Sequence, residues 1–107
     1  MSGTALITLD SIPIPVDDVV GRTVQNPPDN QMEAVLVLPS RGRINVLNEI
    51  GARIWSLADG TRPVKEIASA ICDDYDIDQP TAEKDTLEFL EVLLDRGVIR
   101  LSENLGG

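Results

Sequence analysis

The side chains of this sequence that could carry chemistry are mainly carboxylates and one thiol. Asp73, Asp74, Asp76 and Asp78 follow one another closely, directly after Cys72. Spaced carboxylates are the ligands of calcium loops, but such a loop also needs a central glycine and a closing glutamate, and both are missing here. The aspartates therefore indicate a solvated acidic surface, and no metal site is predicted.

Histidine is absent from the sequence, which excludes Ser-His and Cys-His nucleophile pairs and imidazole metal ligands. Cys72 follows Ile71 in an expected helix, where a packed small hydrophobe is favoured over a reactive thiol. Gly42, Gly51 and Gly60 do not have the spacing of a phosphate-binding loop. We therefore expect no catalytic centre and no cofactor.

Composition narrows the function further. The 107 residues suit one domain, and the aromatic fraction of 3% predicts an aliphatic core. A net charge of -9 argues against nucleic-acid and anionic membrane surfaces as partners. No apolar run approaches the roughly 18 residues of a transmembrane helix. The single cysteine cannot form an internal disulfide, which favours a reducing compartment, so we expect a cytoplasmic protein.

The stretch 43–60 must position whatever site exists. Ile44 and Val46 alternate with Arg43 and Asn45, which predicts a strand over 43–47 with one buried face. Asn48 is a good helix N-cap, and a helix over 48–58 follows. A strand that runs directly into a helix leaves a groove along its edge.

The remaining elements complete an α+β domain. Strands are expected at 19–25 and 33–39, forming a three-stranded antiparallel meander with 43–47. Helices are expected at 63–75 and 79–96, the latter capped by Asp78, and 98–101 returns to the sheet. Residues 1–18 are expected to be a flexible, loosely attached arm, in which two prolines forbid a central strand. The domain would span 19–101 and be followed by a tail, 102–107.

These elements, with their motifs in order, resemble the PqqD family. The motifs are LNEIGARIW at 47–55, Asp59-Gly60, PVKEIA at 63–68 and KDTLEFLEVLLDRGVI at 84–99. The resemblance runs from Val19 to Ile99. The sequence departs from the family pattern at Pro63 and at Gln79-Pro80, and the segment before Val19 lies outside the match.

The resemblance implies a winged-helix-like fold, no catalysis and a precursor peptide as partner. Members bind the leader segment of the precursor and present it to a modifying enzyme, such as a radical S-adenosylmethionine protein, a cyclodehydratase or a leader protease. The leader would add as a strand beside 43–47, in the groove against the third helix. Carried over onto this sequence, the peptide-binding residues would be Arg43, Ile44, Asn45, Val46, Leu47, Asp85, Glu88, Phe89, Val92 and Arg96.

Other interpretations stay open at this point. Phe89 and Val92 could belong only to the core, and Asp85 and Glu88 only to a solvated face. Trp55 is expected to be partly buried on a helix flank rather than to anchor a partner. A winged-helix nucleic-acid-binding or regulatory module and a small enzyme are the rival functions. The unprotected sheet edge predicts a monomer in dilute solution and allows strand-exchanged dimers.

Overall fold

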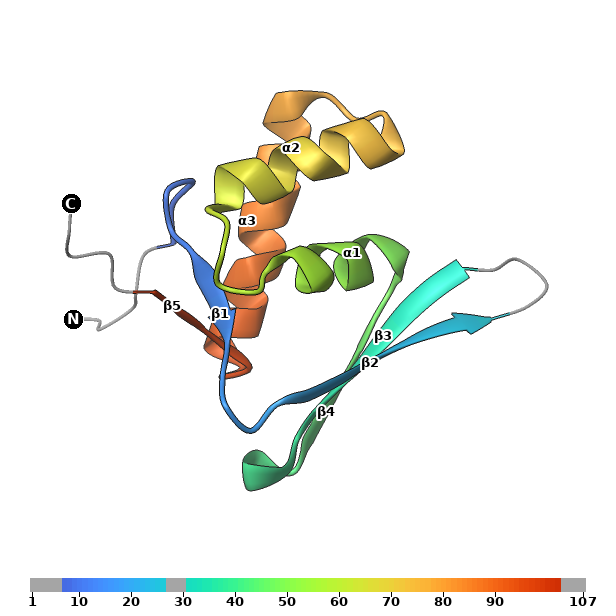
Figure 1. Cartoon of the computed structure of the whole chain (residues 1–107), viewed down its shortest axis with the longest axis vertical. Coiled ribbons are helices and arrows are strands. Elements are labelled where there is room, and N and C mark those ends of the chain that lie inside the picture. The colour runs from blue at the N-terminus through green and yellow to red at the C-terminus, as the bar shows by residue number, and fades with distance from the viewer. Residues whose placement is uncertain (1–6, 27–30, 103–107) are drawn as a thin grey trace.

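The computed structural model describes residues 7–26 and 31–102, and it is an α+β domain (Figure 1). The main sheet is antiparallel and consists of β2 (Val20–Asn26), β3 (Gln31–Leu38) and β4 (Arg43–Leu47). The helices α1 (Glu49–Leu57), α2 (Val64–Tyr75) and α3 (Gln79–Asp95) follow, and a short 3-10 helix, Pro39–Arg41, joins β3 to β4. The predicted three strands and three helices are confirmed, with boundaries shifted by at most two residues.

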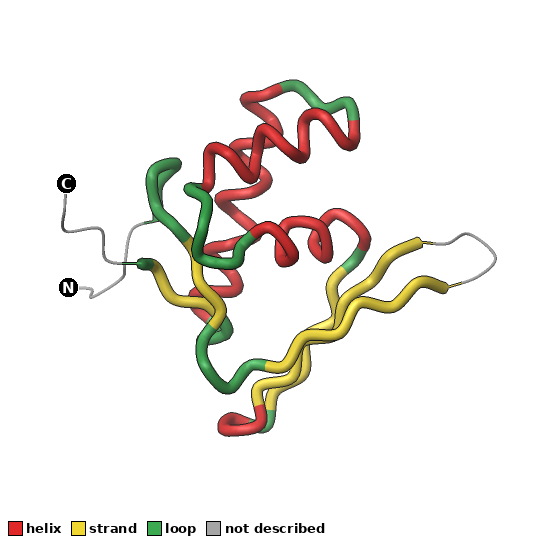
Figure 2. Tube along the Cα trace, viewed as in Figure 1, coloured by secondary structure: helices red, strands yellow, loops and turns green. Residues whose placement is uncertain are grey.

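The three helices lie on one side of the main sheet, and its strand order is β2-β3-β4 (Figure 2). β3 is central, and its Leu36 lies opposite Asn45 while Val37 lies opposite Ile44. Residues directly opposite each other share a face of the sheet. Leu36 is fully buried, so Asn45 faces the helices and Ile44 faces away from them.

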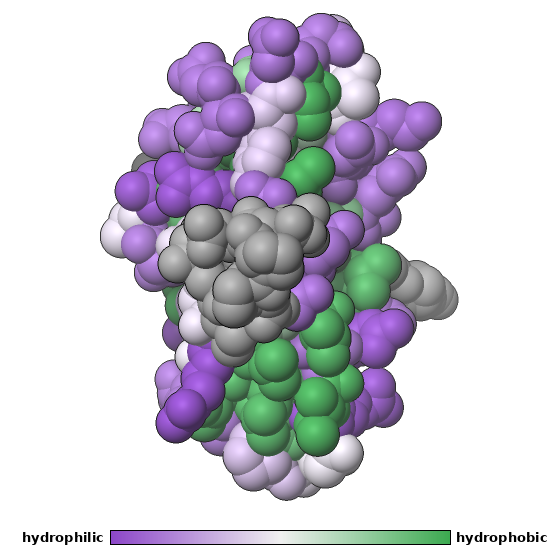
Figure 3. Space-filling model, turned by 90° about the vertical axis from the view of Figure 1, so that its right-hand side faces the viewer, coloured by the Kyte–Doolittle hydropathy of each residue, from purple (hydrophilic) through white to green (hydrophobic). Residues whose placement is uncertain are grey.

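The predicted alternation of β4 is confirmed, and the structure shows which of its faces is buried. Ile44 and Val46 are each 67% exposed, whereas Asn45 is only 8% exposed and Leu47 is buried. The buried face therefore does not hold the apolar pair Ile44 and Val46. The apolar set of the central strand β3 decides the register, and a strand cannot shift by one residue without exposing that set. Apolar side chains consequently gather in the lower half of the molecule, where the main sheet lies (Figure 3).

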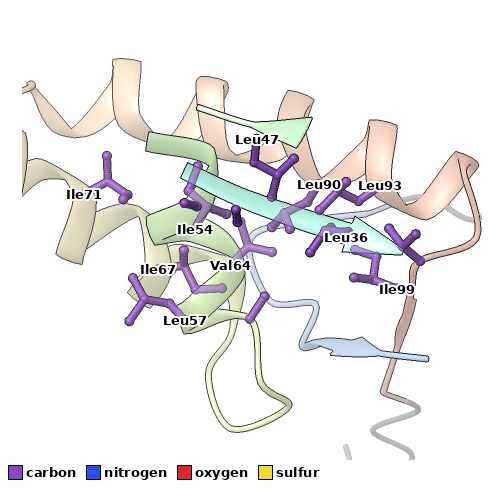
Figure 4. Packing of buried hydrophobic residues seen from close by; sticks show 14 of the residues in the cluster. Leu36, Leu47, Ile54, Leu57, Val64, Ile67, Ile71, Leu90, Leu93 and Ile99 are labelled. Atoms are coloured by element: carbon purple, nitrogen blue, oxygen red, sulfur yellow. The ribbon is translucent and has the colours of Figure 1, made fainter. Parts of the chain in front are cut away.

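The core is aliphatic, as predicted, and lies between the sheet and the helices (Figure 4). Each helix contributes a stripe with the expected spacing of three and four residues. Ten of the core residues are labelled in Figure 4: Leu36, Leu47, Ile54, Leu57, Val64, Ile67, Ile71, Leu90, Leu93 and Ile99. Trp55 is partly buried, as expected, and its indole lies so close to Gly21 of β2 that a Cβ there would be 2.7 Å from Nε1.

The helix ends follow the local signals in the sequence. The Asn48 side chain accepts a hydrogen bond of 2.9 Å from the Gly51 backbone N–H, so it caps α1. Asp78 accepts from the Thr81 N–H at 3.2 Å and caps α3. α2 ends at Tyr75, and the next residue, Asp76, has a φ of 56°, in the left-handed region that stops a helix. Both predicted caps are therefore confirmed.

The described residues before β2, 7–19, pack against the rest of the domain, where the sequence had suggested a loosely attached arm. β1 (Pro13–Pro15) pairs antiparallel with β5 (Ile99–Leu101) in a separate two-stranded sheet, so the expected return of 98–101 to the main sheet is wrong. The backbone N–H groups of Val64 and Lys65 donate to the carbonyls of Ser11 and Leu9, each at 2.9 Å. A two-stranded ribbon accepts prolines because both strands are edges. The domain boundary at residue 19 stays a prediction, and residues 1–6 and 103–107 lie outside the described residues.

Candidate functional site

A groove of about 280 Å³ lies between the edge of β4 and the last turns of α3. We call it the β4–α3 groove. Its volume is just below the roughly 300–1,000 Å³ of pockets that hold small molecules, so it suits one or two side chains of a longer ligand. Its lining residues come from β4, from α3 and from the residue directly after α3: Ile44, Asn45, Val46, Leu47, Phe89, Val92, Leu93 and Arg96.

One wall of the groove is the free edge of β4. This strand pairs with β3 on one side, and no described strand pairs with its other side. In an antiparallel pair, every second residue directs both its N–H and its C=O to the partner, and the residues between direct theirs outward. The outward groups of β4 therefore form a row of unused donors and acceptors that an extended peptide can pair with.

The other wall is α3, where Phe89 and Val92 have different degrees of burial. The Phe89 ring is partly buried and packs against α1 at Gly51, where a Cβ would lie 2.9 Å from Cε1 and 3.0 Å from Cζ. Glycine at this position therefore permits the close approach of the ring. Val92 lies one turn further along, lines the groove and is 48% exposed. Phe89 thus belongs both to the core and to the groove wall, while Val92 is mainly surface.

The groove has one polar end, formed by Asn45 and Arg96. Arg96 Nη1 donates a hydrogen bond of 2.8 Å to Asn45 Oδ1, which connects the end of α3 to the middle of β4. The other side-chain atom of Asn45, Nδ2, is buried and has no hydrogen-bond partner among the described residues. Thr86 Oγ1 in α3 is the second buried side-chain atom of this kind in the described part of the chain, but Thr86 does not line the groove.

Most of the predicted peptide-binding residues meet at this groove. Arg43, Asp85 and Glu88 are the exceptions, since all three are solvent-exposed and none lines it. Sequence reasoning assigned Leu93 to the core alone, although it both packs in the core and lines the groove. Its position four residues after Phe89 was the signal that could have placed it on the groove wall.

Shifted pKa values lie away from the groove and have structural causes. Burial raises the pKa of the Cys72 thiol, which disfavours a reactive thiolate, and Cys72 Sγ lies 3.2 Å from Gln79 Oε1. Burial raises the pKa of Tyr75, and the charge of Glu49 adds to this shift. Within the described residues no group of three or more potential metal ligands was found, and the groove lining holds no nucleophile beside a base.

No helix in the described part of the chain is long and apolar enough to cross a membrane.

The described ion pairs hold helices and loops to each other at the surface. Arg53 of α1 pairs with Asp74 of α2 at 2.7 Å, and both side chains are partly exposed. Such a pair contributes little, typically below about 1 kcal/mol. The chemistry that the arrangement supports at the groove is therefore binding, through backbone groups, apolar walls and one guanidinium.

Comparison with known proteins gives one family and three similar structures. The family model described as "Coenzyme PQQ synthesis protein D (PqqD)" matches residues 33–99. The chain is similar to TbiB1, solved in complex with the TbiA(beta) leader peptide, with 31% identity and a TM-score of 0.72 over 85% of this chain and 99% of that one. None of the curated proteins matches the chain.

Two further structures are similar. One is the solution NMR structure of the PqqD truncation of Methylobacterium extorquens PqqCD, a functional and stand-alone recognition element for ribosomally synthesized and post-translationally modified peptides. Its identity is 27% and its TM-score 0.70, over 94% of this chain and 99% of that one. The other, lasso peptide synthetase B1 complexed with the leader peptide, has 20% identity and a TM-score of 0.59, over 78% and 99%, and supports the fold alone.

Proposed function

The chain belongs to the PqqD family, and on that premise we propose that it binds the leader segment of a ribosomally made precursor peptide without catalysing a reaction itself. One observation of the structure supports this proposal above all. The open edge of β4 directly borders a groove whose other wall is α3. This combination offers a peptide both backbone partners and a side-chain pocket.

The leader would bind as an added antiparallel strand along β4, so that the main sheet becomes four-stranded. Backbone hydrogen bonds give affinity without reading the sequence, and the pocket must therefore supply selectivity. Apolar leader side chains would enter between β4 and α3, against Phe89 and Val92. Arg43, Asp85 and Glu88 would contact a leader that extends beyond the groove.

The modifying enzyme would meet the leader while this chain holds it. Within this proposal the partner is a maturation enzyme, such as a radical S-adenosylmethionine protein, a cyclodehydratase or a leader protease, acting in the cytoplasm. Nucleic-acid binding has no support from the surface of α3, where after Lys84 the charged residues are acidic until Arg96. The net charge of -9 on the whole chain would also repel the phosphates of a nucleic acid.

A proline scan of 43–47 tests strand addition. Proline removes one backbone N–H, so a variant at an outward-facing position loses a bond to the leader, while a variant at an inward-facing position loses a bond to β3. One alternating set, either 43, 45 and 47 or 44 and 46, should therefore lose binding with the fold intact. Binding is measured by isothermal titration with a leader peptide that the wild-type chain binds. If every folded variant binds that leader at full strength, strand addition is ruled out.

A further inference from the structure

We propose that Arg96, held in place by Asn45, selects leaders that place a carboxylate side chain at the polar end of the β4–α3 groove. The inference rests on the proposed function, because it specifies which peptides the same groove accepts. Arg96 would contact the ligand, and Asn45 would act as a positioning residue. The selected chemistry is an aspartate or glutamate that lies beside the apolar residue bound against Phe89 and Val92.

The first step is the hydrogen-bonding chemistry of the pair. A guanidinium has five N–H donors and no acceptor, and the structure uses Nη1 for the bond to Asn45. That bond occupies the amide oxygen of Asn45, so its remaining polar group is the Nδ2 donor, which has no partner among the described residues. The side-chain groups that this end of the groove offers a ligand are therefore the remaining N–H donors of Arg96, and a carboxylate is the side chain that only accepts.

The second step is the position of Asn45. It occupies an inward-facing site of β4, two residues before the buried Leu47, and it is 8% exposed. A buried amide with an unpaired donor destabilises a fold, whereas a leucine of similar shape would not. Asparagine at this site therefore lowers the stability of the fold, and the interaction that the structure shows for it is the hydrogen bond that orients Arg96 across the groove.

The third step is that Arg96 keeps its charge free. None of the ion pairs between described residues involves it, although Glu91 and Asp95 are near in sequence. Asp85 and Glu88 lie eleven and eight residues earlier on α3, hence roughly 16 and 12 Å away along the axis. Salt screens charges beyond about 8–10 Å, so these two carboxylates do not neutralise Arg96. Among the described residues that line the groove, none is acidic, and Arg96 is the one charged residue.

The experiment uses the full chain and a displayed library of random peptides as the probe. Wild-type protein should enrich peptides that hold an aspartate or glutamate at a fixed spacing from an apolar residue. One enriched peptide is then synthesised with glutamate, glutamine or lysine at that position, and fluorescence anisotropy measures the affinities. The glutamine peptide should bind wild type about tenfold more weakly, as expected for the loss of a charged hydrogen bond.

Variants separate recognition from structure. Arg96→Met keeps the aliphatic stem and should bind the glutamate and glutamine peptides equally. Arg96→Glu should reverse the preference towards the lysine peptide, a result that a purely structural arginine cannot produce. Asn45→Leu should unfold at a temperature no lower than wild type, yet lose most of the discrimination. Circular dichroism checks folding, and Arg96→Lys provides a charge-conserving control if Arg96→Glu does not fold.

The outcomes distinguish this inference from the proposed function. Enriched peptides that bind the groove, but without a fixed acidic position and with equal affinity after glutamate is replaced by glutamine, overturn the carboxylate selectivity alone. A glutamate preference that survives in Arg96→Met also overturns it. A library that yields no binding peptide refutes the proposed function and this inference together.

Discussion

Val92 offers a clean separation of leader binding from folding, because the chain contains a matched control. Val92 lines the β4–α3 groove and is 48% exposed, and Val20 on β2 is 52% exposed but does not line the groove. We predict that Val92→Ala weakens leader binding while Val20→Ala leaves it unchanged. Both variants delete the same two methyl groups from half-exposed valines, and only Val92 lines the groove.

The magnitude follows from the exposed fraction. Two methyl groups are worth about 1.6 kcal/mol when fully buried, at about 0.8 kcal/mol for each buried carbon. Since solvent reaches about half of Val92, a bound leader can cover only that half, which gives about 0.8 kcal/mol, or roughly a fourfold rise in Kd. The part of the Val92 side chain that folding already buries is buried in both the free and the leader-bound protein, so its removal affects stability and not Kd. In α3 the better helix propensity of alanine offsets part of that loss of stability.

Isothermal titration with the leader measures the Kd of wild type and both variants, and thermal unfolding shows that they are folded. The reasoning is refuted if Val92→Ala binds within experimental error of wild type. An equal loss in Val20→Ala would also refute it, because binding would then depend on the outer face of the sheet or on global stability.

Further predictions concern the fold and the association state. Asn48→Ala should lower the free energy of unfolding by about 1 kcal/mol, because α1 loses the cap on the Gly51 N–H, and urea denaturation measures this. The pKa values of Asp59 and Asp78 are lowered by hydrogen bonds from Thr61 and Thr81 respectively, so both carboxylates stabilise the fold when ionised. That stabilisation is complete above the unfolded aspartate pKa of about 3.9 and is lost as the pH falls further, and Asp78→Asn should reduce this dependence in acid titrations followed by circular dichroism. Light scattering at low micromolar concentration should show a monomer, and an obligate dimer there would contradict this.

The helices were predictable because their signals are local. Asn48 and Asp78 are polar residues directly before apolar periodic stretches, and both form the caps that the sequence predicts. The same holds for the stop of α3, where Gly97 has a φ of 81°. Each of these features depends on a few neighbouring residues, so no knowledge of the tertiary contacts was needed.

The exposed face of β4 and the N-terminal packing were not predictable, because both depend on distant residues. Ile44 lies outward only because its partner on β3 is Val37 and not Leu36. β1 pairs Pro13 with Leu101, and nothing near either residue signals a partner at the other end of the chain. Register and long-range pairing are set by the burial of the whole sheet, which a local pattern does not reveal.

The sequence predicted most of the residues of the candidate site, but it did not predict how their side chains contact one another. The apolar stripe with Phe89 and Val92 on α3 and the edge strand were both visible in the sequence, and the groove lies between them. The bond between Arg96 and Asn45 joins residues 51 positions apart, and the sequence placed both in the site without indicating their contact. Their pairing appears only when α3 folds against β4.

Amide hydrogen exchange of β4 tests the central claim most directly. The exchange rate of each backbone N–H in 43–47 is measured by NMR with and without a leader peptide that the wild-type chain binds. In the free protein the amides of one alternating set should be protected by β3 and those of the other should exchange rapidly. The account predicts that leader binding protects the second set while the first is unchanged. Leader binding that leaves the second set exchanging rapidly would contradict strand addition at β4.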